Sequence, residues 1–175
     1  MAGLQMALYA PKSEWVPPSE FPDLSKAKQI AIDLETRDPN LMKLGPGWPR
    51  SDGEVVGYAV AVDGWAAYFP INHLGGGNLD KRLVEGWMKK VCASPADKIF
   101  HNAQYDVGWL RAHGIPVSGR IVDTMVVASL LDENRDVEDA RHVCRAVRAD
   151  RRRAYFGAME FFQGKGEPRR LARRC

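Results

Sequence analysis

Short apolar runs, separated by polar or by glycine- and proline-rich stretches, divide the first 131 positions of the chain. The run at 29–35 is rich in isoleucine, and runs at 54–62 and 65–71 flank Asp63-Gly64, a pair that favours a two-residue hairpin turn. Two shorter runs lie at 98–101 and 120–123. These runs predict five strands, of which the second and third form a hairpin.

Three segments between or after the strands have helical character. The first, 79–93, follows Asn78, a residue type that caps helices, and places an apolar residue at every fourth position: Leu79, Leu83, Trp87 and Val91. The second, 103–113, is closed by Gly114, and the third covers 124–131. The segment 36–53, with three prolines and three glycines, is expected to be a long loop.

The order of these elements is strand, hairpin, helix, strand, helix, strand, helix. Such an order predicts a mixed sheet in which an antiparallel part is followed by parallel crossovers, with helices on its faces. The expected fold class is therefore α/β, with five strands in one sheet.

The two ends of the chain differ in texture from this body. Residues 1–28 are expected to form an extended arm, with Trp15 and Phe21 as anchors, and residues 29–134 the folded domain. Eleven of the sixteen arginines lie between Arg135 and Arg174. We interpret 135–175 as a basic tail that is poorly ordered or frame-disrupted, because its charge leaves little to bury.

The cysteines and the apolar content limit where the protein works. Three cysteines without a CxxC pair argue against a disulfide framework and against a zinc site. No apolar run approaches the ~20 residues that a membrane span needs. We therefore expect a cytoplasmic protein with no membrane partner.

Four polar side chains follow or end predicted strands. Asp33 and Glu35, at i and i+2 of one strand, point to the same face, while Asn102 and Asp106, at i and i+4, share one face of the next helix. If the two strands are neighbours, three carboxylates meet. Oxygen ligands without His or Cys select Mg²⁺ or Mn²⁺. Each pair alone is common, and the alternative is that Asp33 caps a loop and Asp106 is a solvated helix residue.

Three segments in this order resemble a known family. The sequences IAIDLET at 30–36 and HNAQYDVGWL at 101–110 resemble the first and second exonuclease motifs of DnaQ-like proteins, and IVDTMVVASLL at 121–131 resembles the segment that follows the second motif there. Their form is similar to that of the 3′→5′ exonuclease domain of family A, phage-type DNA polymerases. The resemblance covers roughly 29–134 and implies a ribonuclease H-like fold.

The resemblance also implies roles for individual residues. Asp33, Glu35 and Asp106 would bind two Mg²⁺ or Mn²⁺ ions and serve catalysis. Leu34, Thr36 and Asn102 would bind substrate, the 3′ end of single-stranded DNA, and Asp123 would be structural. A polymerase domain or subunit is the implied partner.

One family motif does not occur in this sequence. Proofreading members carry a Tyr-x-x-x-Asp, and no tyrosine of this chain is followed by aspartate at that spacing. We therefore expect impaired exonuclease activity. The alternatives are an inactive nucleic-acid-binding remnant and an exonuclease that trims RNA.

Other conspicuous residues are predicted to be structural. Tyr105, Trp109 and Trp87 have the helical spacing of core residues, although such rings can also stack on bases. His73 and His101 are expected to be hydrogen-bonded rather than to bind metal, and Cys92 to be buried.

Overall fold

A computed structural model of the protein describes residues 16–74 and 76–131. Its sheet has five strands in the order β3-β2-β1-β4-β5. The strands are β1 (Gln29–Arg37), β2 (Glu54–Val62), β3 (Trp65–Pro70), β4 (Asp97–Phe100) and β5 (Ile121–Asp123). β1, β2 and β3 pair antiparallel, whereas β4 pairs parallel with both β1 and β5.

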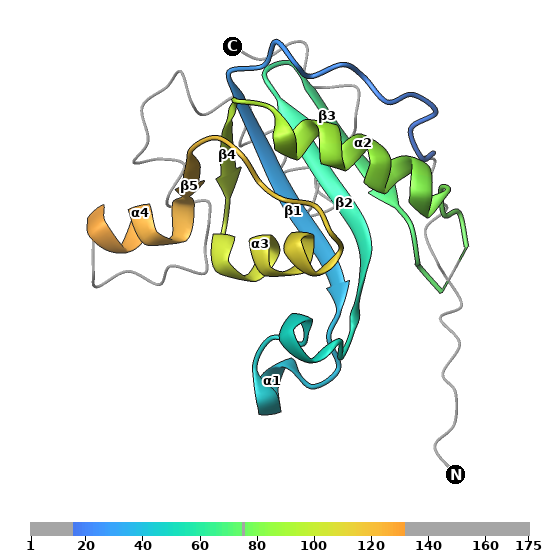
Figure 1. Ribbon diagram of the computed structural model, residues 1–175, viewed down its shortest axis with the longest axis vertical. Coiled ribbons are helices and arrows are strands. Elements are labelled where there is room, and N and C mark those ends of the chain that lie inside the picture. The colour runs from blue at the N-terminus through green and yellow to red at the C-terminus, as the bar shows by residue number, and fades with distance from the viewer. Residues whose placement is uncertain (1–15, 75, 132–175) are drawn as a thin grey trace, which may run out of the picture.

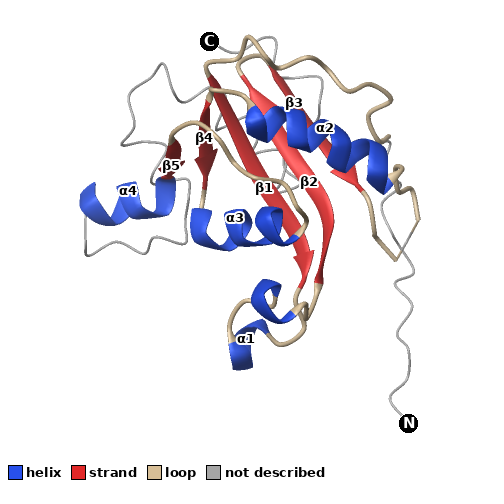
Figure 2. Cartoon of the chain, viewed as in Figure 1, coloured by secondary structure: helices blue, strands red, loops and turns tan. Residues whose placement is uncertain are grey.

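The helices comprise the three that the sequence predicts and a short one within the predicted loop 36–53. They are α1 (Leu41–Leu44), α2 (Lys81–Ala93), α3 (Ala103–Ala112) and α4 (Thr124–Leu131), with a 3₁₀ turn η1 at Trp48–Arg50. α2 and α3 cross the same face of the sheet (Figures 1 and 2). The predicted α/β fold, a mixed five-stranded sheet flanked by helices, is therefore confirmed.

The main core lies between the sheet and these two helices. Ile30, Ile32 and Leu34 alternate along β1 and belong to the same buried cluster as residues of α2 and α3. Trp87 and Trp109 belong to it too, as predicted, and each buried large side chain contributes roughly 1.5–3 kcal/mol. Cys92 is buried as predicted, and burial raises the pKa of its thiol to about 12.

The predicted start of α2 was wrong, and its predicted face was right at Trp87 and Val91 but wrong at Leu83. The helix begins at Lys81, and the cap is Asp80, whose Oδ1 accepts hydrogen bonds from the backbone N of Arg82 and Leu83 at 2.8 and 3.1 Å. Leu83 is 63% exposed. A strict four-residue spacing drifts around a helix of 3.6 residues per turn, so the buried face instead comprises Val84, Trp87, Met88, Val91 and Cys92.

The segment 36–53 is more regular than the predicted loop. β1 runs on to Arg37, and α1 and η1 follow. Two hydrogen bonds tie the segment to itself: the Asp38 carboxylate accepts from the Gly47 backbone N at 2.8 Å, and the Asn40 amide donates to Asp52 at 3.0 Å. These contacts depend on side chains far apart in the segment, which hydrophobic periodicity does not reveal.

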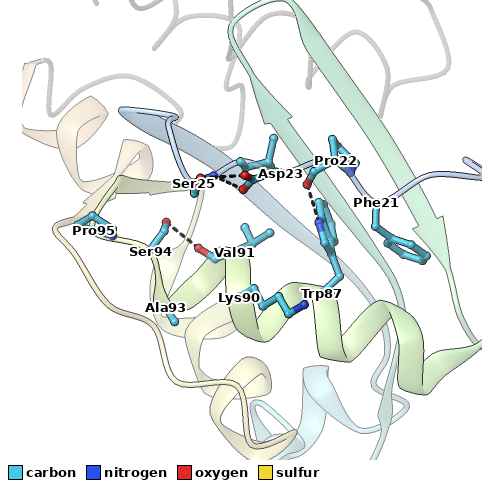
Figure 3. Close-up of a pocket in the computed structure, with 11 residues that line it drawn as sticks. Phe21, Pro22, Asp23, Ser25, Trp87, Lys90, Val91, Ala93, Ser94 and Pro95 are labelled. Carbon is cyan, nitrogen blue, oxygen red and sulfur yellow. Dashed lines mark hydrogen bonds between the residues drawn. The ribbon is translucent and has the colours of Figure 1, made fainter.

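The arm is anchored where the structure describes it. The Phe21 ring stacks on the Phe69 ring, with 5.6 Å between the ring centroids, and its centroid is 5.9 Å from that of the Trp87 ring. These contacts confirm Phe21 as an anchor. The Trp87 indole N–H donates to the Pro22 carbonyl at 2.9 Å, as Figure 3 shows. Trp15 and the tail 135–175 lie outside the described residues. Within the described part of the chain, no helix combines the length and apolarity needed to cross a bilayer.

Candidate active site

Asp33 and Glu35 project from the carboxyl-terminal half of β1. They alternate with the buried Leu34, so both carboxylates lie on the face of β1 opposite the main core. Asp33 is half-buried and Glu35 is exposed. Burial, with the negative charge of Glu35, raises the pKa of Asp33 to about 6. The register of β1 and β2 shifts between Glu35 and Thr36, an irregularity that often lies beside functional sites.

The short β4 explains how α3 reaches this part of β1. β4 pairs with β1 at Gln29, Ile30 and Ala31. β4 ends at Phe100, and α3 begins at Ala103, so the chain turns into the helix where β1 runs on toward Asp33. Asp106, in the first turn of α3, is 3% exposed.

Asp106 lies within the electrostatic range of the β1 carboxylates. Burial raises the pKa of Asp106 to about 9, and the charges of Asp33, Asp123 and Glu35 add to the shift in that order. Its Oδ2 atom is buried and makes no hydrogen bond among the described residues. A buried carboxyl oxygen without a partner is costly, which makes it a natural ligand for a cation.

Asn102 and Asp123 shape the start of α3. Asn102 adopts a left-handed backbone with φ of 69°, and its side chain makes no cap hydrogen bond. The Asp123 carboxylate accepts from the backbone N of Asn102 at 3.1 Å and of Ala103 at 2.8 Å. Asp123 therefore fixes the helix N-terminus that carries Asp106, in keeping with the structural role implied for it.

Thr36 and Leu34 are placed on the α3 side of β1. The Thr36 hydroxyl is 2.7 Å from the hydroxyl of Tyr105, which also donates to Asp38 at 3.2 Å. Tyr105 packs against the core as predicted, but its hydroxyl links β1 to the segment after it. The Leu34 side chain is buried, so its backbone alone is left for a ligand.

The donor set fits a hard divalent cation in its chemistry. The candidates are three carboxylates without His or Cys, one of them with an orphaned buried oxygen. Among the described residues, no three His, Cys, Asp or Glu side chains are already gathered closely enough to hold a metal ion. Burial, and after it the repulsion between like charges, raises the pKa of both Asp33 and Asp106.

Sequence reasoning missed one residue near the carboxylates. Tyr68 of β3 hydrogen-bonds through its hydroxyl to Nε2 of His73, and its pKa is raised by burial and then by Glu35 and Asp33. His73 and His101 are hydrogen-bonded as predicted, the latter to the Thr124 hydroxyl at 3.0 Å. The hairpin turn at 63–64 could have identified Tyr68, because the turn sets the register of β2 and β3. That register pairs Tyr68 with Ala59, which is the partner of Asp33.

The chain is similar in sequence to DNA polymerases. It is 40% identical over 121 residues to a DNA-directed DNA polymerase of Pseudomonas phage M6, a match that covers 66% of this chain and 18% of the polymerase. It is 26% identical over 122 residues to DNA polymerase I of Synechocystis sp., covering 66% and 11%, and 28% identical over 151 residues to that of Chloroflexus aurantiacus, covering 79% and 16%. Each match spans less than a fifth of the relative.

Similar solved structures include nucleases. Brucella melitensis NrnC has a TM-score of 0.47 and 23% identity, covering 70% of this chain and 53% of that one. The POL domain of Pol1 from M. smegmatis has a TM-score of 0.43 and 17% identity, covering 61% and 16%. No family model matches the chain. The resemblance to DNA polymerases that the motifs indicate is confirmed by the sequence matches.

Proposed function

Because this chain is related to a segment of phage and bacterial DNA polymerases, we propose that it is their metal-dependent 3′→5′ exonuclease domain. Its substrate is the 3′ end of single-stranded DNA, from which it removes nucleotides by hydrolysis of phosphodiesters. Its partner is a polymerase domain or subunit, and it works in the cytoplasm of a bacterium or of a phage-infected host.

Asp33, Glu35 and Asp106 are the proposed catalytic residues and metal ligands. Two bound Mg²⁺ or Mn²⁺ ions would supply stabilisation of the attacking water and of the leaving oxygen. The charge of Glu35 raises the pKa of Asp33, and the charge of Asp33 acts on the pKa of Asp106 more strongly than any other charge. Asp33 therefore interacts electrostatically with both of the other carboxylates. It would thus contribute to holding both ions.

The observation that carries this proposal is the environment of Asp106. A carboxyl that is 3% exposed, with an orphaned Oδ2 and three carboxylates within electrostatic range, is unfavourable in its charged form. A divalent cation removes this penalty by neutralising the cluster. A purely structural aspartate would instead have a hydrogen-bond donor at that oxygen.

Leu34, Thr36 and Asn102 are the proposed substrate-binding residues. The Thr36 hydroxyl is held by Tyr105 next to the carboxylates of β1, where the sugar of the terminal nucleotide would lie. Leu34 contributes backbone, because its side chain is in the core. Asn102 stands at the N-terminus of α3, four residues before Asp106.

One sequence feature favours a second function. These 175 residues contain no Tyr-x-x-x-Asp, the motif that completes the metal site and orients water in proofreading relatives. The second candidate is therefore a domain that binds a nucleic-acid end without cutting it. An exonuclease that trims RNA is a variant of the first proposal.

An end-labelled strand separates these functions. Single-stranded DNA labelled at its 5′ end is incubated with the full chain and Mn²⁺, and the products are resolved by length. Progressively shorter labelled products indicate removal from the 3′ end, whereas early release of a labelled mononucleotide contradicts the polarity. Binding without shortening supports the second function, and a matched RNA strand tests the substrate class.

Two variants make the assay specific. Asp33→Ala is expected to abolish shortening. Asp63→Asn, in the exposed hairpin turn after β2, keeps a favoured turn residue and is expected to leave shortening unchanged. Equal shortening by wild type and Asp33→Ala would refute the proposed site.

A further inference from the structure

Tyr68 lies on the same face of the sheet as Asp33. Asp33 pairs with Ala59 across β1 and β2, and Ala59 pairs with Tyr68 across β2 and β3. Directly paired residues of antiparallel strands point to the same side. The Tyr68 side chain therefore projects from the carboxylate face, two strands from Asp33.

Gly57 leaves room for the Tyr68 ring to extend toward Glu35. A Cβ placed on Gly57 would lie 1.9 Å from the Tyr68 hydroxyl oxygen, and Gly57 is the direct cross-strand partner of Glu35. The hydroxyl thus occupies the place where a side chain opposite Glu35 would begin. By the usual spacing of cross-strand pairs, it is roughly 5 Å from the Glu35 Cβ.

The electrostatics agree with this position. Burial, and after it the charges of Glu35 and Asp33, raise the pKa of Tyr68 far above its ordinary value. The hydroxyl therefore keeps its proton at neutral pH, as a hydrogen-bond donor must.

His73 and Asn78 hold this hydroxyl in place. The His73 Nε2 hydrogen-bonds to the Tyr68 hydroxyl, and the two rings meet edge to face at 5.7 Å. The His73 backbone is itself fixed in both directions: its N–H donates to the Asn78 Oδ1 at 2.7 Å, and its carbonyl accepts from the Asn78 Nδ2 at 2.9 Å. Asn78, predicted as a helix cap, serves this turn instead.

We propose that Tyr68 contacts the phosphate group of the bound nucleotide as a hydrogen-bond donor, and that His73 is the positioning residue that orients its hydroxyl. This inference rests on the proposed function and adds a substrate contact to it. Carboxylates repel a phosphate, so a site lined by Asp33 and Glu35 needs donors as well as cations. The hydroxyl of Tyr68 provides one on the β3 side of the site, where no carboxylate was predicted.

The test compares two ligands that differ by one phosphate. Thymidine 5′-monophosphate and thymidine are titrated onto the full chain in Mg²⁺, and the ratio of their affinities measures recognition of the phosphate. Tyr68→Phe is expected to reduce that ratio about tenfold, the usual effect of losing a hydrogen bond to a charged group, and to leave thymidine affinity unchanged. Tyr58→Phe is the matched control, since Tyr58 is fully buried in the main core, where it contacts Glu85.

Variants of the supporting residues test the positioning role. His73→Ala is expected to lower the ratio as Tyr68→Phe does, and His73→Gln, which keeps an N–H donor, to restore part of it. Gly57→Ala places a methyl group at the position of the hydroxyl and is expected to lower it too. A residue with a purely structural role would change both affinities together.

The outcomes separate this inference from the function on which it rests. If the phosphate preference is lost in Asp33→Ala but kept in Tyr68→Phe, the inference about Tyr68 is overturned and the proposed function is not. Equal loss in Tyr58→Phe and Tyr68→Phe, with lowered melting temperature in both, also overturns it. A wild-type chain without any phosphate preference overturns the proposed function and the inference together.

Discussion

Two carboxyl groups of the candidate site keep their protons to higher pH than free aspartate does. Burial and neighbouring charge raise the pKa of Asp33 to about 6 and that of Asp106 to about 9, from an ordinary value of 3.8. Between pH 3.8 and these raised pKa values, the folded state binds more protons than the unfolded state. Stability therefore decreases as pH rises through this window.

The pH dependence of stability tests whether the pKa values of Asp33 and Asp106 are raised. Without divalent ions, the melting temperature is expected to decrease between pH 5 and pH 8, because Asp33 and Asp106 must ionise against burial. Asp106→Asn, which stays neutral, is expected to show a shallower decrease, and Mg²⁺ to raise the wild-type melting temperature at pH 8. Identical slopes for wild type and Asp106→Asn, measured by calorimetry, would refute the assigned environment.

At the scale of elements, α3 and η1 are packed with no space to spare. A Cβ on Gly108 of α3 would lie 2.4 Å from the Trp48 ring of η1, whereas one on Gly86 of α2 would meet nothing within 4 Å. Both glycines are helical, so the two sites differ in packing alone.

Alanine at these two glycines is expected to have opposite effects. Gly108→Ala should destabilise the protein by about 1–3 kcal/mol through overpacking. Gly86→Ala should stabilise it by up to about 1 kcal/mol, because glycine is unfavourable inside a helix. Urea denaturation measures both, and a Gly108→Ala variant as stable as wild type would contradict the close docking of η1.

A buried lysine joins the loops at the other end of the sheet. The Lys98 ammonium is fully buried and donates to the carbonyls of Ser94, Ala96 and Ser118 at 2.8, 2.9 and 3.1 Å. These carbonyls lie after α2 and before β5, so one side chain connects two crossovers. Burial lowers the pKa of Lys98.

Lys98→Met is therefore expected to be strongly destabilising. It keeps much of the side-chain volume but leaves three carbonyls without their donor, at a cost of about 3 kcal/mol or more. Lys89→Met, on the exposed face of α2, is the control and should change stability by less than about 0.5 kcal/mol. Comparable stability of the two variants in urea would show that the buried contacts contribute little.

The element order was predictable from sequence, but several details were not. Apolar runs predicted all five strands, since burial on a sheet requires them. Asn78 and Asp80 are both residue types that cap helices well. Asp80 is the cap in the structure, because the Asn78 side chain hydrogen-bonds to the backbone of His73 instead. The carboxylates could be recognised from their spacing in the sequence. Tyr68 could not be recognised from spacing alone, because its position level with Asp33 depends on the register of three strands, which is a long-range property.

At the scale of the whole molecule, the number of carboxylates available to the site limits its activity. Three carboxylates come from β1 and α3, and the sequence lacks a Tyr-x-x-x-Asp that would add a fourth. The purified chain is therefore expected to digest single-stranded DNA orders of magnitude more slowly than a complete two-metal site allows, since a poorly held ion stabilises the reaction less. Rapid Mg²⁺-dependent digestion, measured as nucleotide released per unit time, would contradict this.

The central claim is that carboxylates of β1 and α3 share divalent ions, and a titration of Mn²⁺ followed by electron paramagnetic resonance tests it most directly. The account predicts that the wild-type chain binds two ions, that Asp33→Ala and Asp106→Asn each weaken this binding at least about tenfold, the effect of losing a charged ligand, and that Asp63→Asn does not. Unchanged Mn²⁺ binding in Asp106→Asn would show that α3 contributes no ligand and would contradict the site.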